Sequence, residues 1–185
     1  MRIISGSAKG RKLKTVPGEG TRPVTDRVKE SLFDILAGDI AGCRFLDLFA
    51  GTGGVGLEAL SRGAAEAVFV EQGRAAFDTL RFNLAHTQLQ DRAQTVRADV
   101  FAFLSVPPPT PFDFIYIAPP QYKGLWLETL HALDARPGWL SAEGAIIVQI
   151  HPREFQAVEL QHFEPAGERK YGSTLLCFYE LREPG

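Results

Sequence analysis

A glycine-rich turn directly after a short apolar segment places the strongest constraint on how this chain folds. Residues 51–56 read Gly-Thr-Gly-Gly-Val-Gly, and residues 43–49 before them form an apolar run of strand length. We expect a helix from the turn to about residue 62. At such a strand–turn–helix junction, glycines let the backbone approach a ligand closely, and the first helical N–H groups face that ligand. The turn therefore predicts a βαβ unit with a ligand site above it.

Strand-like and helix-like segments alternate along the rest of the chain. The expected strands are 43–49, 67–71, 93–97, 112–117 and 144–150, and helices are expected at 26–36, 74–84, 100–104 and 125–133. This alternation favours an α/β fold with a largely parallel sheet covered by helices on both faces. Two late segments, near 158–163 and at 171–181, are separated by a turn around Gly167 and not by a helix. We therefore expect a terminal hairpin that contributes one antiparallel strand.

The composition indicates a single domain in a reducing compartment. The chain has 185 residues, 45% of them hydrophobic, which is enough to bury a core without disulfide or metal staples. Cys43 and Cys177 form no CxxC pair, and the histidines lack metal-ligand spacing, so we expect no metal and a cytoplasmic location. No apolar run approaches ~18 residues, and the first residues lack a signal peptide's apolar region, so we expect neither secretion nor a membrane span.

The charge is unevenly distributed along the chain. Residues 1–30 carry eight basic and three acidic side chains, whereas the remainder carries 12 basic and 19 acidic ones. A basic segment on an acidic body is typical of polyanion binding, although a solvated surface would have the same composition. Because glycines separate the charges, we expect a flexible surface that follows phosphates without reading bases. The side chains that we assign to this surface are Lys9, Arg11, Lys12 and Lys14.

Three carboxylates end or directly follow successive predicted strands. Glu71 lies 20 residues after Gly51, where it can accept hydrogen bonds from ribose hydroxyls, as it would in a dinucleotide dehydrogenase. Asp47 favours S-adenosylmethionine instead, because a carboxylate there can order a cationic amino group but would repel a pyrophosphate. Asp99 can accept a hydrogen bond from an adenine amino group. Each carboxylate alone could be a helix cap or a surface charge, but together they predict an S-adenosylmethionine site.

Three blocks of sequence are distinctive beyond the glycine turn. They are GSAKGRKL at 6–13, TRPVTDRVKESLF at 21–33 and LDLFAGTG at 46–53. Together with a late Tyr171-Gly172, they closely resemble the RsmD family, whose members are bacterial methyltransferases acting on a guanine N2 of 16S ribosomal RNA. The glycine motif is generic to Rossmann-like methyltransferases, whereas the block at 21–33 is far more specific.

The resemblance implies a fold, a cofactor and a partner. The fold would be a Rossmann-like class I methyltransferase domain at 26–185, with a mostly parallel seven-stranded sheet, a C-terminal antiparallel hairpin and a basic N-terminal extension at 1–25. The cofactor would be S-adenosylmethionine, the partner would be 16S rRNA or the small ribosomal subunit, and we expect a monomer. Residues 21–25 would close over the methionine end of the cofactor. The cofactor residues implied are Thr21, Arg22, Pro23, Thr25, Asp47, Phe49, Gly51, Gly53, Glu71 and Asp99.

The chain departs from the family's fourth motif, Asp/Asn-Pro-Pro-Tyr/Phe. Ala118 has no side-chain acceptor, and Gln121 separates Pro120 from the aromatic Tyr122. A guanine amine needs acceptors that hold its N–H groups and turn its lone pair toward the methyl group. We expect the carbonyls of Ala118 and Pro119 to serve as these acceptors, because proline restrains the turn. Tyr122 would stack on the extruded base, unless the insertion makes Gln121 its neighbour instead.

Other functions share some of these features. An adenine-N6 or DNA methyltransferase would use the same Pro-Pro-aromatic element. A non-catalytic ribosome-assembly factor would keep the cofactor fold and bind RNA through its basic segment. A nicotinamide oxidoreductase would keep the glycine turn and the acidic residue after the next strand. The sequence favours guanine-N2 methylation over all three.

Overall fold

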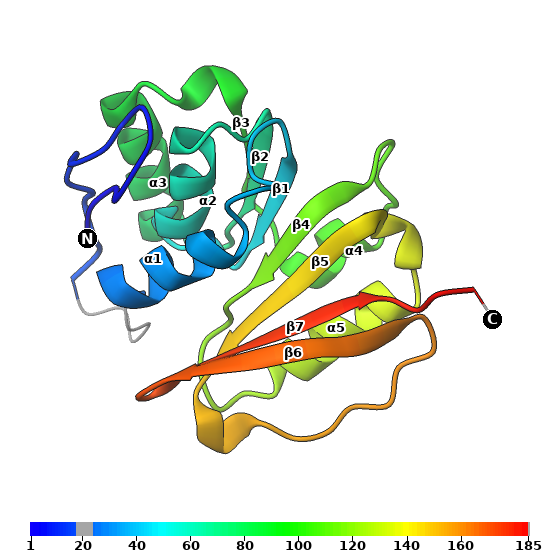
Figure 1. Ribbon diagram of the computed structural model, residues 1–185. Helices are drawn as coiled ribbons and strands as arrows, with labels where there is room; N and C mark the ends of the chain where they lie inside the picture. The colour runs from blue at the N-terminus through cyan, green and yellow to red at the C-terminus, as the bar shows by residue number, and fades with distance from the viewer. Residues whose placement is uncertain (18–23, 185) are drawn as a thin grey trace.

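Seven strands form one mixed sheet in the computed structural model, which describes residues 1–17 and 24–184 (Figure 1). The strand order is β3-β2-β1-β4-β5-β7-β6. The strands are β1 (Arg44–Leu48), β2 (Glu66–Val70), β3 (Ala93–Val96), β4 (Phe112–Ile117), β5 (Leu140–Ile150), β6 (Phe163–Tyr171) and β7 (Thr174–Leu181). Strands β1 to β5 pair in parallel, whereas β7 runs antiparallel to both β5 and β6. The predicted fold class is therefore confirmed.

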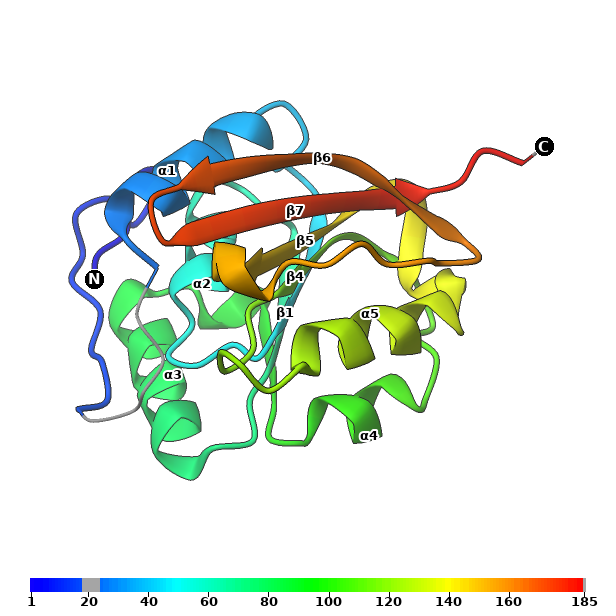
Figure 2. The same ribbon diagram turned by 90° about the horizontal axis from the view of Figure 1, so that it is seen from below.

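Helices cover both faces of this sheet (Figures 1 and 2). The α-helices are α1 (Asp26–Ile35), α2 (Gly54–Ser61), α3 (Arg74–Thr87), α4 (Val100–Leu104) and α5 (Leu125–Asp134), and short 3-10 turns lie at Gln90–Arg92, Pro137–Trp139 and Pro152–Glu154. Helices α1, α2 and α3 pack into one apolar cluster, and α4 and α5 pack into a second cluster on the opposite face. Within 1–17 and 24–184, no helix has the length and apolar character that crossing a membrane requires.

Strand β1 shows how a strand with both faces covered carries one buried polar residue. Phe45 belongs to the cluster under α1, α2 and α3, whereas Leu46 and Leu48 belong to the cluster under α4 and α5. Asp47 shares the face of Phe45, because side chains two positions apart in a strand point the same way. Its carboxylate accepts a hydrogen bond from the N–H of Gly56 in α2 at 3.0 Å. The strand therefore fixes this carboxylate beneath the start of α2.

The terminal hairpin is confirmed, but its predicted boundaries are wrong. The structure has no strand at 158–162, and the tight turn lies at residues 172–173 and not at Gly167. Gly167 instead sits in β6 with φ +126, where the pairing with β7 shifts after Pro165. Strand β6 is an edge strand, and edges tolerate proline, bulges and exposed charges. These residues make the strand look like a loop in the sequence.

Residues 1–17 pack against the domain, so the expected flexible surface is wrong for this part of the chain. Ile3, Ala8 and Leu13 are buried and belong to the cluster under α1, α2 and α3. Within this segment, Arg2 and Lys12 form an isolated antiparallel bridge. The boundary at residue 25 stays an interpretation.

Gly6 allows this N-terminal segment to approach α2. Its φ is +86, and a Cβ there would lie 1.9 Å from the carbonyl oxygen of Ser61. Gly10 has a similar φ of +83, but a Cβ there would meet nothing within 4 Å. Substitutions at these two glycines therefore distinguish the cost of backbone strain alone, at Gly10, from the cost of strain with steric overlap, at Gly6.

We expect Gly6→Ala to lower the free energy of unfolding more than Gly10→Ala does. Gly10→Ala costs only the left-handed strain, ~1–2 kcal/mol. Gly6→Ala adds a displacement of packed backbone, worth ~1–3 kcal/mol more. Equilibrium urea denaturation of both variants measures the difference, and equal losses would contradict the close approach.

Candidate functional site

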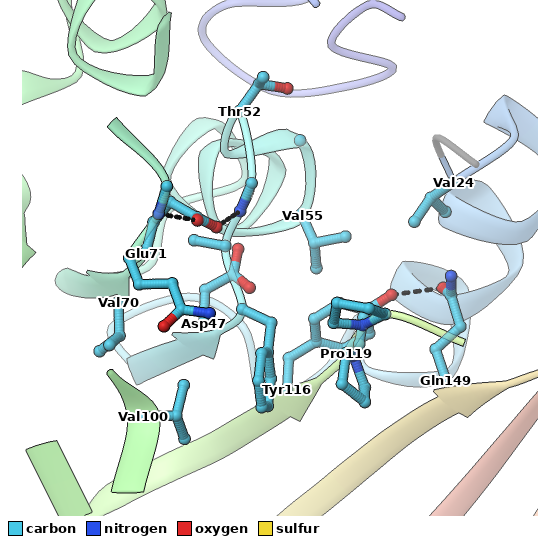
Figure 3. Close-up of a pocket in the computed structure, with 18 of the residues that line it drawn as sticks. Val24, Asp47, Thr52, Val55, Val70, Glu71, Val100, Tyr116, Pro119 and Gln149 are labelled. Carbon is cyan, nitrogen blue, oxygen red and sulfur yellow. Dashed lines mark hydrogen bonds between the residues drawn. The ribbon is translucent and has the colours of Figure 1, made fainter. Parts of the chain in front are cut away.

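A cavity of about 660 Å³ opens at the carboxyl edge of the parallel strands (Figure 3). Its walls come from the ends of β1, β2, β4 and β5, the glycine turn, the Pro-Pro turn and the N-terminal segment. Ligand sites of open α/β sheets lie along this edge, because the strand ends present their loops together there. The sequence-predicted residues among its lining are Asp47, Phe49, Gly51, Glu71, Asp99, Ala118, Pro119, Pro120 and Tyr122.

The glycine turn brings the backbone of β1 over the cavity. Phe49 and Gly51 have φ of +60 and +57, and Gly53, the N-cap of α2, has φ +91. A Cβ on Gly56 would lie 2.3 Å from the Phe69 ring and 3.1 Å from the Asp47 carboxylate. The last glycine is therefore required where α2 crosses the sheet. Gly53 supports the turn but does not line the cavity.

Glu71 ties two loops together at the end of β2. Its Oε2 accepts a hydrogen bond from the N–H of Gly51 at 2.8 Å, and its Oε1 accepts one from the N–H of Gly73 at 2.7 Å (Figure 3). Each carboxylate oxygen can accept a further bond, because it has two lone pairs. Glu71 thus fixes the turn while its remaining acceptor sites stay available to a ligand. Its contact with ribose stays a prediction.

Asp47 forms the floor of the cavity and is only 2% exposed. Burial raises the pKa of this carboxyl to about 7; the hydrogen bond from the Gly56 N–H opposes the shift, and the negative charge of Glu71 adds to it. The group therefore titrates near neutral pH. A cationic amino group placed beside it would favour the ionised form.

Asp99 caps a helix as well as lining the cavity. Its Oδ1 accepts hydrogen bonds from the N–H groups of Phe101 and Ala102 at 2.9 and 3.1 Å, at the start of α4. The capping interpretation is correct for this residue. Its proposed contact with adenine stays a prediction.

The Pro-Pro turn places Tyr122 at the rim of the cavity. Tyr122 has φ +60 and is 64% exposed, and its N–H donates to Oε1 of Glu154 at 2.7 Å. Its ring lies 5.8 Å from the ring of His151. His151 caps the short 3-10 turn by accepting from the N–H of Arg153. Glu154 was missed from the sequence, because nothing local links it to a residue 32 positions away.

A second polar contact lies beneath the Pro-Pro turn. The hydroxyl of Tyr116 on β4 donates a hydrogen bond to Oε1 of Gln149 on β5 (Figure 3). Burial raises the pKa of Tyr116 well above its usual value, and the nearby Asp47 charge raises it further. Both side chains line the cavity. The available sequence signal was one glutamine in the otherwise apolar run 145–150.

The N-terminal segment supplies one wall of the cavity, which Met1, Thr15, Val16 and Val24 line. Val24 belongs to the segment 21–25 that was expected at the cofactor, whereas Met1, Thr15 and Val16 were not predicted. Thr25 does not line it; its Oγ1 accepts a hydrogen bond from the N–H of Val28 and caps α1. The other three residues expected at the methionine end, Thr21, Arg22 and Pro23, lie outside the described residues.

The four basic residues assigned to a polyanion surface differ in their surroundings. Arg11 donates to the carbonyl of His86 at 2.7 Å, and the Lys14 ammonium lies 3.8 Å from the centre of the Phe82 ring. These two residues therefore help to hold the N-terminal segment on α3. Lys9 and Lys12 are exposed, and in residues 1–17 and 24–184 neither side chain forms an ion pair.

In the described part of the chain, no group of three or more His, Cys, Asp or Glu side chains has a metal-binding arrangement. The carboxylates at the cavity instead accept backbone N–H groups. Their chemistry suits hydrogen-bond donors and cationic groups of a ligand.

Comparison with known proteins places this geometry in a family. A family model described as Conserved hypothetical protein 95 matches residues 1–180. Ribosomal RNA small subunit methyltransferase D of Escherichia coli K12 is 43% identical over 149 residues, covering 80% of this chain and 74% of that protein. A solved hypothetical protein from Thermus thermophilus matches with a TM-score of 0.82 and 32% identity, over 98% and 99% of the two chains.

A more distant structure shares the fold alone. An RNA methyltransferase from Salinibacter ruber in complex with S-adenosyl-L-homocysteine has a TM-score of 0.68 at 13% identity, over 88% of this chain and 95% of that one. The family match is far stronger, because it spans nearly the whole chain and includes the distinctive block at 21–33. The chain therefore belongs to the Conserved hypothetical protein 95 family, the RsmD family of methyltransferases that its motifs resemble.

Proposed function

We propose that this protein transfers a methyl group from S-adenosylmethionine to the exocyclic N2 of a guanine in 16S ribosomal RNA. The observation that carries the proposal is the joining of two predicted elements in one cavity. The glycine turn with Asp47 and Glu71 lies on one side, and the Pro-Pro turn with Tyr122 lies on the other. The name of the Escherichia coli relative, with its small-subunit rRNA substrate, supports the choice of RNA.

The cavity suits S-adenosylmethionine in size and chemistry. Its volume of about 660 Å³ falls within the ~300–1,000 Å³ typical of small-molecule sites. Glu71 would hold the ribose hydroxyls, Asp47 the cationic amino group and Asp99 the adenine amino group. The bound cofactor supplies a methyl group on a positively charged sulfur.

The Pro-Pro turn would hold the target base beside this cavity. Tyr122 presents an exposed ring, and base–aromatic stacking contributes ~1–3 kcal/mol per base. The hydrogen bond from its N–H to Glu154 fixes the loop that carries the ring. The carbonyls of Ala118 and Pro119 would accept from the amine. Catalysis then depends on positioning two bound substrates.

Methyl transfer to small-subunit particles tests the proposed function directly. Particles purified from cells lacking the active gene are incubated with the protein and isotopically labelled S-adenosylmethionine, and the nucleosides are identified by mass spectrometry. We expect labelled N2-methylguanosine. Labelled N6-methyladenosine would favour the adenine methyltransferase, and no transfer despite S-adenosylhomocysteine binding would favour the assembly factor.

Asp47 should make cofactor binding depend on pH. A carboxyl with a pKa of about 7 is mostly neutral at pH ~5.5 and mostly ionised at pH ~7.5. Only the ionised form attracts a cationic amino group, so the affinity for S-adenosylhomocysteine should rise by ~10-fold over this range. Calorimetry measures the affinity, and Asp47→Asn should abolish the rise.

The same group predicts a trend in stability without ligand. Its folded pKa lies above its unfolded value of about 4, so the folded state binds this proton more tightly. The stabilising contribution is complete below pH ~4 and is lost as the pH rises through about 7. Asp47→Asn should lack this component in urea denaturation. If the free energy of unfolding of the parent protein and that of Asp47→Asn changed with pH in the same way, Asp47 would account neither for the stability trend nor for the pH dependence of cofactor binding.

The basic N-terminal segment should bind RNA phosphates through its free lysines. Each phosphate contact that is removed on single-stranded RNA lowers the slope of log affinity against log salt by ~0.7. We expect Lys9→Glu and Lys12→Glu each to weaken particle binding and reduce this slope in filter-binding titrations. Arg136→Glu is the matched control, because Arg136 is exposed beyond the end of α5 and does not line the cavity. Equal slopes in all three variants would mean that RNA docks elsewhere.

A further inference from the structure

At the carboxyl ends of β1, β4 and β5, side chains that lie in register point to the same face of the sheet. Asp47 pairs with Tyr116 across β1 and β4, and Tyr116 pairs with Ile147 across β4 and β5. Ala118 follows Tyr116 by two positions, directly after the end of β4, and Gln149 follows Ile147 by two positions in β5. Both come directly after the paired residues Ile117 and Val148. Since side chains two positions apart share a face, Ala118 and Gln149 are neighbours on the face that carries Asp47 and Tyr116.

Gln149 is a side-chain amide anchored inside this part of the cavity. The buried Tyr116 hydroxyl donates to its Oε1, so the amide is held beside Pro119 (Figure 3). An amide oxygen has two lone pairs and can accept from a second donor. Two other glutamines, Gln72 and Gln121, also line the cavity but are exposed at its rim. Gln149 alone among these three is partly buried and held by a hydrogen bond to a buried side chain.

We propose that Gln149 supplies the side-chain acceptor for the target amine that Ala118 does not provide. The inference rests on the proposed function and names a residue of that same site. In the usual motif the side-chain acceptor stands at the end of β4, where this chain has Ala118. Here the acceptor would come instead from Gln149, at the adjacent position on β5. Because the strand register fixes this neighbour, the substitute acceptor faces the same space as a side chain at 118 would.

The chemistry requires one acceptor for each N–H of the amine. Oε1 of Gln149 takes the N–H that was assigned above to the carbonyl of Ala118, and the carbonyl of Pro119 takes the other. These two hydrogen bonds turn the nitrogen lone pair toward the methyl carbon. The new N–C bond forms as the C–S bond breaks, and the electron pair of that bond stays on sulfur. The methylated nitrogen then carries a positive charge and loses one proton to water. Gln149 keeps its protons throughout.

Gln149→Leu removes the amide and keeps a side chain of similar size. We expect kcat for methyl transfer to fall by at least ~10-fold, because a hydrogen bond to the reacting amine is removed. The affinity for S-adenosylhomocysteine, measured by calorimetry, should stay within about twofold of that of the parent protein. This unchanged affinity would show that the variant is folded. Gln149→Met, which is equally long and lacks the amide, is the second variant if Gln149→Leu does not bind.

Restoring the usual motif provides the decisive comparison. Ala118→Asn introduced into Gln149→Leu should recover most of the lost kcat, because an amide again faces the amine from the end of β4. A purely structural role for Gln149 would not be repaired by a change on another strand. Parent-like kcat in Gln149→Leu, or no recovery in the double variant that binds S-adenosylhomocysteine, would overturn the inference. Absence of transfer by the parent protein would instead overturn the proposed function.

Discussion

The buried carboxylate of Glu58 connects the elements that enclose the site. It lies in α2 with no exposure, accepts the N–H groups of Ile4 and Ser5 at 2.9 and 3.0 Å, and pairs with Lys29 of α1 at 3.3 Å and Arg62 at 2.9 Å. A buried charge of this kind is tolerated only with several partners, and removing one costs about 3–5 kcal/mol. This group holds the N-terminal segment and α1 against α2, and the N-terminal segment carries one wall of the cavity. Glu58 thus supports that wall without lining the cavity itself.

The parts of the fold that were predicted correctly are those with local signals. The glycine turn at 51–56 and the alternation of strands and helices depend on residues close together in sequence. The N-terminal segment gave no such signal, because Ile3, Ala8 and Leu13 are isolated apolar residues among glycines and charges. Their burial depends on the apolar cluster that α1, α2 and α3 form, which the sequence does not display. The start of β6 was misplaced because its exposed charges obscure the period of a strand.

The residues of the candidate site also divide into those with a local sequence signal and those without one. Asp47, Glu71 and Asp99 follow strands that could be recognised, so their meeting at one edge was predictable from the rule for parallel sheets. The polar contact between Tyr116 and Gln149 joins residues 33 positions apart and requires the register of β4 and β5. Thr25 was placed in the site by resemblance, and its hydroxyl caps α1, as a threonine directly before a helical pattern indicates. Its contact with a cofactor stays a prediction.

Counting charges along the N-terminus also combines residues with different physical roles. Lys29 is completely buried against Glu58, and burial lowers its pKa, which Glu58 partly opposes. Arg11 and Lys14 contact α3, so their charges act first within the fold. Lys9 and Lys12 are exposed, so their charges are accessible to a polyanion without a change in packing. The excess of basic residues therefore combines side chains that dock this segment on the domain with side chains that are exposed to solvent, and salt screens the exposed charges more strongly than the buried ones.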